Sequence, residues 1–151
     1  MLELPHAAVG AAIASAFPNP VISLPLSFLS HFATDFIPHW NPHLYSEIKK
    51  YGRISTRTLS FLAGDSLAAL GLGVYLATKS PTPQAINILL SCFFAVLPDV
   101  IEIPFYLFNI RSQWLSSLVN FQRRNQWNVP ALPGIISQIT ALLFCLLVIF
   151  S

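Results

Sequence analysis

The chain has 151 residues, of which 54% are hydrophobic and only 9% are charged, and its net charge is +2. Soluble domains carry about 25% charged residues, so this composition excludes an ordinary soluble protein and predicts an all-α integral membrane protein. The small net charge gives no indication of a nucleic-acid partner. We expect residues 1–151 to form a single membrane-embedded helical domain.

Two apolar segments open the chain. Residues 6–17 are small and helix-forming but too short to span a bilayer fully, whereas residues 21–39 form a run of nearly sufficient length. Pro18-Asn19-Pro20 lies between them and predicts a chain break. We therefore expect a helical hairpin with a tight turn. The N-terminus lacks the basic residues of a cleaved signal peptide.

The middle of the chain alternates between polar loops and apolar helices. Residues 40–57 are polar, and a short surface helix is expected around Leu44–Tyr51. Residues 58–78 and 84–108 are apolar and long enough to span, with a short turn between them. Two prolines in the second of these helices predict a kink or a break, which is tolerated where backbone lines a cavity.

The C-terminal part combines an amphipathic segment with the most apolar one. Apolar residues recur at helical spacing within residues 109–129, which suits a helix lying on the membrane interface. Residues 130–151 carry no charge and form the clearest spanning segment. The predicted fold is thus a polytopic helical bundle of about five segments, with a short first helix and an interfacial helix before the last.

Basic residues predict the orientation of the bundle. The loop at residues 40–57 holds four Lys or Arg residues and residues 109–129 hold three, whereas the turn at residues 79–83 holds one. We therefore expect the two basic loops on the cytoplasmic side of the inner membrane. The N-terminus would also be cytoplasmic if the first helix crosses the bilayer.

Ionisable side chains inside the apolar segments are the candidate functional residues. His31, Asp35 and His39 are spaced four residues apart, so on one continuous helix they would share a face. A helix rise of about 1.5 Å per residue places acids from other segments in the same cytoplasmic half of the membrane. The residues expected to converge there are His6, His31, Asp35, His39, Asp65, Asp99 and Glu102.

A bound cation would make this cluster tolerable in lipid. An unpaired buried carboxylate costs several kcal/mol, and no Lys or Arg lies within the apolar segments to neutralise it. Imidazole nitrogen and carboxylate oxygen are ligands for divalent metals, so we expect one or two ions, with zinc favoured. Such an ion lowers the pKa of bound water, and Asp99 or Glu102 would act as the general base.

Structural roles remain open for several of these residues taken singly. Asp65 could hydrogen-bond to a neighbouring helix, and Asp99 after Pro98 could cap a restarted helix. His39 beside Trp40 could anchor the chain at the interface.

Several short motifs occur in a characteristic order. They are Pro5-His6, Ser30-His31, Asp35-Phe36-Ile37-Pro38-His39-Trp40, Gly64-Asp65 and Leu97-Pro98-Asp99. With them the chain resembles small bacterial integral-membrane proteins grouped as membrane-bound metal-dependent hydrolases. The resemblance implies hydrolysis and a metal site built from His6, His31, Asp35, His39, Asp65 and Asp99. One departure is Gln122, where similar sequences carry a histidine.

The expected function is therefore metal-dependent hydrolysis at the cytoplasmic membrane face. Arginines flank the site and lipid can reach it laterally, so a phosphoester or lipid-like substrate is favoured. Arg123 and Arg124, with Gln122 beside them, are the expected substrate-binding residues, since Arg binds phosphate bidentately. The alternative is that these arginines face anionic lipid.

Two other classes of function stay open. One is a proton or metal-ion transporter that uses the intramembrane carboxylates as a relay. It needs polar groups in the external half of the membrane, where the sequence places only Asn87, Ser91, Gln138 and Thr140. The other is a structural membrane protein in which a metal clips the helices together.

Overall fold

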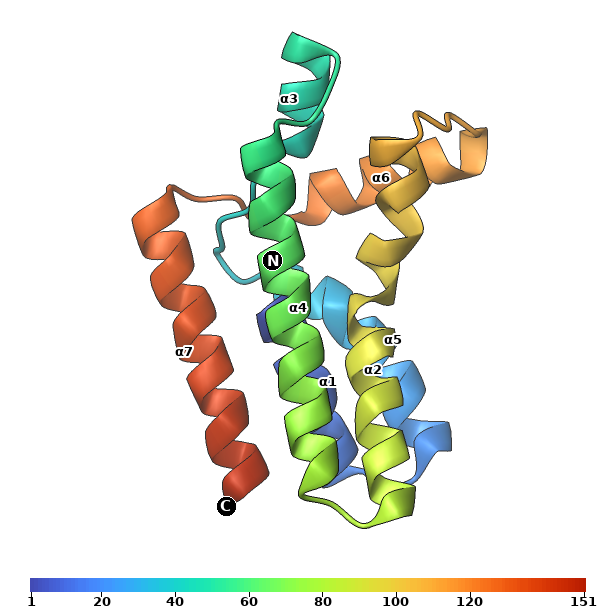
Figure 1. The fold of residues 1–151 in the computed structure, drawn as a ribbon, viewed down its shortest axis with the longest axis vertical. Coiled ribbons are helices and arrows are strands. Elements are labelled where there is room, and N and C mark those ends of the chain that lie inside the picture. The colour runs from blue at the N-terminus through green and yellow to red at the C-terminus, as the bar shows by residue number, and fades with distance from the viewer.

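The computed structural model describes residues 1–151 and contains seven helices and no strands (Figure 1). The helices are α1 Glu3–Ala16, α2 Pro20–Asp35, α3 Leu44–Tyr51, α4 Thr56–Thr78, α5 Thr82–Leu107, α6 Gln113–Asn125 and α7 Ala131–Phe150. The all-helical prediction is confirmed. α4, α5 and α7 are long and apolar enough to cross a membrane, as expected of a membrane protein.

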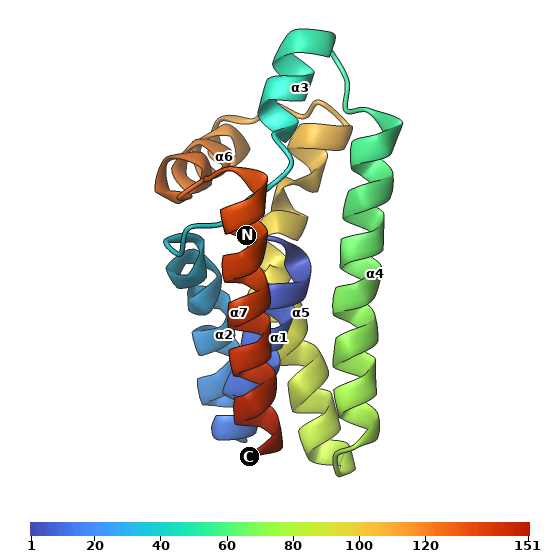
Figure 2. The same ribbon diagram turned by 90° about the vertical axis from the view of Figure 1, so that its left-hand side faces the viewer.

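The hairpin of α1 and α2 occupies only part of the height of the bundle. In Figure 1 the N-terminus lies at mid-height, α1 descends from there to the turn at residues 17–19, and α2 returns to about the same level. Figure 2 shows the same arrangement beside the much longer α4. The start of α1 and the end of α2 therefore meet in the interior, where both pack against α5.

Small residues allow α1 to pack so closely. Ala7, Ala8, Ala11 and Ala14 are at most 1% exposed, although the helix has only 14 residues. At Gly10 an added Cβ would overlap the main-chain carbonyl of Ser91 on α5. Such close approach is the usual basis of helix association in lipid, where the hydrophobic effect between helices is lost.

A line of buried polar side chains follows the interface between α2 and α5. The Ser23 hydroxyl donates to Asn87 Oδ1 at 2.7 Å, near the 17–19 turn. One turn further along both helices, Ser27 and Ser91 are fully buried and have no hydrogen-bond partner. The next turn of α2 brings His31. We call these four Ser and Asn residues the polar seam.

The end of α2 differs from the prediction. The helix stops at Asp35, so His31, Asp35 and His39 do not share one helical face. Pro38 has no N–H to continue a helix. Instead, the His39 N–H donates to the Trp127 carbonyl at 3.0 Å, and a short parallel bridge joins this segment to the chain after α6. Tertiary pairing, and not helical periodicity, positions His39.

α5 also differs from the prediction, because it continues through Pro98 and Pro104 from Thr82 to Leu107. Of the predicted kink or break, the break does not occur, and Asp99 is not the cap of a restarted helix.

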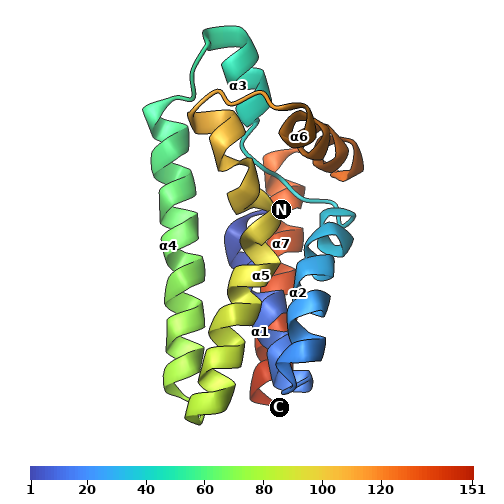
Figure 3. The same cartoon turned by 90° about the vertical axis from the view of Figure 1, so that its right-hand side faces the viewer.

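The end of the bundle that carries α3 and α6 is the basic one (Figure 3). Every Lys and Arg except Lys79 lies in or beside α3, α6 or the first turn of α4. Glu47 of α3 accepts a hydrogen bond from the Ser55 N–H at the start of α4, and this bond lowers the pKa of the Glu47 carboxyl group.

Candidate metal centre

Two histidines orient their rings through main-chain carbonyls. His31 Nδ1 lies 2.8 Å from the Ala95 carbonyl oxygen, and His39 Nδ1 lies 2.8 Å from the Ile37 carbonyl oxygen. A carbonyl oxygen can only accept, so we assign the proton to Nδ1 in both rings. The Nε2 atom of each ring is thereby directed to the interior.

His6 is oriented in the same manner by a hydroxyl group. The Thr34 Oγ1 atom donates to the Ser30 carbonyl at 2.8 Å and lies 3.0 Å from His6 Nδ1, so Nδ1 donates to it. His6 is 1% exposed, and its Nε2 atom has no hydrogen-bond partner. The ring stacks on that of His31, with centroids 4.1 Å apart.

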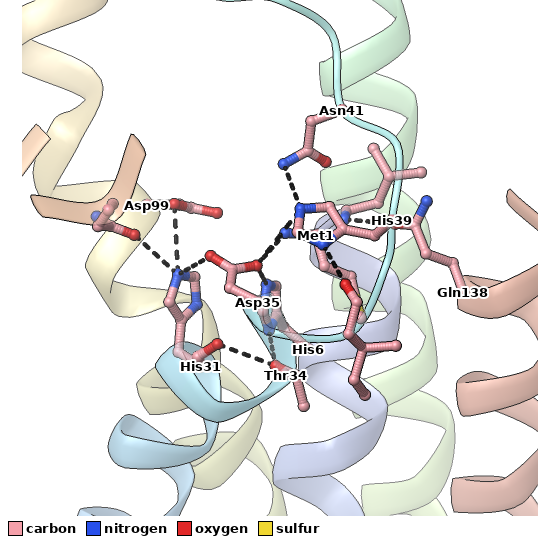
Figure 4. Close-up of polar contacts among 12 residues, drawn as sticks. Met1, His6, His31, Thr34, Asp35, His39, Asn41, Asp99 and Gln138 are labelled. Atoms are coloured by element: carbon pink, nitrogen blue, oxygen red, sulfur yellow. Dashed lines mark hydrogen bonds and ion pairs between the residues drawn. The ribbon is translucent and has the colours of Figure 1, made fainter. Parts of the chain in front are cut away.

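The three Nε2 atoms converge on Asp35 (Figure 4). The distances to its carboxylate are 3.4 Å from His6 and 3.7 Å from both His31 and His39. Asp35 is 3% exposed, and the α-amino group of Met1 also donates to it. No Lys or Arg forms an ion pair with Asp35 or any other carboxylate of the chain.

Asp99 completes the cluster from α5. Its carboxylate lies 3.5 Å from His31 Nε2, and one ligand atom each from His6, His31 and Asp99 fall within 4.8 Å of one another. These three residues could hold a metal ion. The donor set fits, because metal-binding histidines commonly donate their second ring N–H to a protein oxygen. The Asp99 side chain is 24% exposed, so the cluster is open on this side.

Gln122 of α6 connects this cluster to Glu102. Its amide nitrogen donates to Glu102 Oε1 at 2.6 Å and faces the Pro98 carbonyl at 3.4 Å, which fixes the amide orientation. Its oxygen therefore accepts from His31 Nε2 at 3.0 Å, so both ring nitrogens of His31 donate in this structure. Gln122 was predicted to bind substrate, but in the structure it is 2% exposed and positions His31 and Glu102.

Asp65 lies outside the group that could hold an ion. Its carboxylate accepts from the main-chain N–H groups of Glu3 at 2.6 Å and Leu4 at 3.3 Å. These N–H groups have no partner within α1, so Asp65 supplies the cap that the helix needs. This contact is the hydrogen bond to a neighbouring helix that the sequence leaves open for Asp65.

The two predicted substrate-binding arginines have different surroundings. Arg123 lies 3.6 Å above the Tyr45 ring and lines the large cavity that Asp99 and Glu102 also line. Arg124 is exposed and does not line this cavity.

α7 contributes contacts to the site that the predictions from sequence do not include. Gln138 accepts from the Leu2 N–H at 2.7 Å and donates to the Trp40 carbonyl at 3.0 Å, and Ser137 donates to the Pro38 carbonyl. Gln138 therefore lies at the level of the candidate metal centre. A single Gln in an uncharged 20-residue helix was the sequence signal for this role of α7. The candidate residues also omit Glu3, whose carboxylate lies close enough to Asp99 and Asp65 to interact with their charges.

Substitution of Gly134 tests whether the packing of α7 against the His39–Trp40 segment is needed for metal binding. A Cβ at Gly134 would overlap the backbone of Trp40 and His39, so Gly134→Ala should cost about 1–3 kcal/mol and weaken metal binding. Thermal unfolding in detergent and metal titration measure both effects. Gly71→Ala is the matched control, because nothing lies within 4 Å of that position. Equal stability and metal affinity in the two variants would contradict the packing described here.

Comparisons of the chain with protein-family models, curated proteins and solved structures find no match. The fold and the site therefore define a class only: a helical membrane protein with a candidate metal centre of histidine and aspartate.

Proposed function

We propose that the protein is a membrane-embedded metal-dependent hydrolase, of the kind that the sequence motifs resemble. One observation carries the proposal: three imidazoles have Nδ1 bound to protein oxygens and direct Nε2 toward Asp35, with Asp99 beside them. His6, His31, Asp35 and Asp99 would hold one or two divalent ions, with His39 adjacent. His31 would release its Nε2 proton and its hydrogen bond to Gln122 when it binds an ion. Zinc is favoured because the donors are few and include imidazole.

We propose that α3 and α6 lie at the cytoplasmic face of the inner membrane, because they carry the basic residues. The bundle would then have five membrane-embedded segments, α1, α2, α4, α5 and α7. Three would cross, and the α1–α2 hairpin would enter from the external side. A hairpin that ends at mid-height supports an N-terminus inside the bundle, in place of the cytoplasmic N-terminus expected from sequence.

A divalent ion held at this site would supply Lewis acidity and a water molecule of lowered pKa. Asp99 is the candidate base, since it combines partial exposure with a place at the cluster. Glu102, held by Gln122, would accept the proton next. Arg123 would bind a phosphate, because its guanidinium lines the cavity and makes no ion pair. We assign no such role to Arg124.

Two observations weigh on the alternative classes. A structural metal clip is normally closed by protein ligands, whereas Asp99 opens this site to a cavity, which supports an enzyme. A proton transporter draws support from the polar seam, which approaches His31 from the 17–19 turn and contains the unpartnered hydroxyls of Ser27 and Ser91. It remains the second candidate.

Elemental analysis of protein purified without chelator tests the proposal. We expect one or two metal ions per chain, and a chelator should remove both the metal and the hydrolysis of a chromogenic phosphodiester. His31→Ala should lose both, whereas Lys79→Ala, which alters an exposed residue that does not line the cavity, should lose neither. Metal-free protein, or proton flux into dye-loaded vesicles without hydrolysis, would contradict a hydrolase; the flux would favour the transporter.

A further inference from the structure

A large cavity lies between α4 and α5. Its volume is about 820 Å³, within the roughly 300–1,000 Å³ typical of ligand pockets, and 19 of its 32 lining residues are hydrophobic. Figures 2 and 3 show the two helices close together at their connecting turn and farther apart toward mid-height. α1 contributes Leu2, Glu3 and Ala7 to the lining.

The two ends of this cavity differ in chemistry. Toward the α4–α5 turn it is lined by residues such as Leu70, Gly73, Leu89 and Phe93. Toward α3 and α6 the lining residues include Asp99, Glu102, Tyr45 and Arg123. A cavity divided in this way matches an amphiphile, with its chain at the first end and its polar group at the second.

The cavity is accessible from the side that would face lipid. Leu70 is 61% exposed and Phe93 is 48% exposed, and they belong to helices long and apolar enough to cross a membrane. Exposure of these apolar side chains to water is unfavourable, whereas in a bilayer the acyl chains of lipids surround them at high concentration.

Charge decides which kind of amphiphile fits. Arg123 is the only Lys or Arg that lines the cavity. Its Cζ atom lies 3.6 Å from the centre of the Tyr45 ring, and the side chain forms no ion pair and no hydrogen bond to protein, so its N–H groups remain available to a phosphate. Four carboxylates also line the cavity, and three of them are engaged: Asp65 by the amides of α1, Glu102 by Gln122 and Asp99 by His31. The fourth belongs to Glu3, and one of its oxygens has no hydrogen-bond partner.

We propose that this cavity binds a single phospholipid, with one acyl chain between α4 and α5 and the phosphate at Arg123. The inference deepens the proposed function, because it places the phosphoester of a membrane lipid next to Asp99. Binding of the chain itself depends on the apolar walls and not on hydrolysis.

Photo-crosslinking tests the acyl-chain position. The probe is phosphatidylglycerol with a diazirine in its acyl chain, in phosphatidylcholine vesicles containing the full-length protein. Labelling should concentrate on cavity residues such as Leu70 and Phe93, several-fold above the exposed Leu143 and Leu147 of α7. Equal labelling of α7 and the cavity would overturn the proposal.

Matched variants separate the cavity from the outer surface of α4. Ala63→Phe combined with Ser66→Phe fills the cavity wall and should reduce this labelling several-fold. Ala68→Phe adds the same side chain to an exposed position of α4 that does not line the cavity and should leave labelling unchanged. Labelling that persists in the double variant would overturn the chain assignment.

The phosphate position is tested by a second pair of variants. Arg123→Ala should lower the labelling by phosphatidylglycerol several-fold, and Arg124→Ala should not. Stronger labelling by a diazirine-bearing alkylamine than by phosphatidylglycerol would overturn the phosphate assignment. Cavity labelling should persist after chelation. Cavity labelling of protein that is purified without chelator, and that holds no metal and hydrolyses nothing, refutes only the proposed function. Hydrolysis of a soluble phosphodiester without cavity labelling refutes only this inference.

Discussion

Replacing Asp35 by alanine is expected to abolish both metal binding and hydrolysis. Asp35 is the one group that lies within 4 Å of the Nε2 atoms of His6, His31 and His39, and it is almost fully buried. Without its charge, a cation at this site would lose its main buried counter-charge. Loss of even an outer partner of a metal site costs about 10–100-fold, so we expect a larger loss of turnover here.

The fold should survive this substitution, which makes the result interpretable. Asp35 fixes the chain path through its main-chain carbonyl, which accepts from the Trp127 N–H at 3.1 Å and is unchanged in the variant. The only side-chain hydrogen bond that the variant loses is the one from the α-amino group of Met1. Circular dichroism should show the helix content of the wild type. Asp65→Asn is the comparison variant. The Asp65 carboxylate accepts hydrogen bonds from the main-chain N–H groups at the start of α1 and is not a proposed metal ligand, so this variant should keep the metal. Full metal stoichiometry in Asp35→Ala would refute the site.

Gly10→Val should be the most destabilising substitution on the hairpin. A Cβ at this position would overlap the Ser91 carbonyl and lie 3.0 Å from Ala95 Cβ, and neither neighbour can rotate away. Overpacking of this kind costs about 3 kcal/mol at the upper end of its usual range. His6 lies one turn earlier on α1, so separation of α1 from α5 would also displace a proposed metal ligand.

Thermal unfolding in detergent and metal titration of the same preparation measure both consequences of Gly10→Val. Gly71→Val is the matched control, because it introduces the same β-branched side chain into a helix at a site with open space around it. We expect Gly71→Val to unfold near the wild-type temperature and to bind metal normally. A Gly10→Val protein as stable as this control would show that α1 and α5 do not pack as described.

The helical segments were predictable because lipid leaves little choice. Backbone groups in a bilayer must be paired within a helix, so long apolar runs such as those in α5 and α7 predict helices directly. The polar loops, the α1–α2 hairpin and the amphipathic α6 follow from proline, charge and periodicity in the same way. Local composition thus determines which segments are helices, and at what depth along the bundle their ionisable residues lie.

The candidate site could be predicted only in part. Helix rise and segment ends place His6, His31 and Asp99 in a common layer without any knowledge of the packing. They do not show that Asp65 caps α1, or that Gln122 reaches from α6 to His31.

By itself, the sequence determined that this protein has buried histidines and acids in apolar helices, because periodicity and hydropathy are local properties. The tertiary structure decided which of them meet. His39 reaches Asp35 through pairing with the chain after α6, and Gly134 and Gln138 of α7 secure that segment. These contacts join residues about a hundred positions apart, and their geometry depends on how closely the helices pack, which no local pattern encodes.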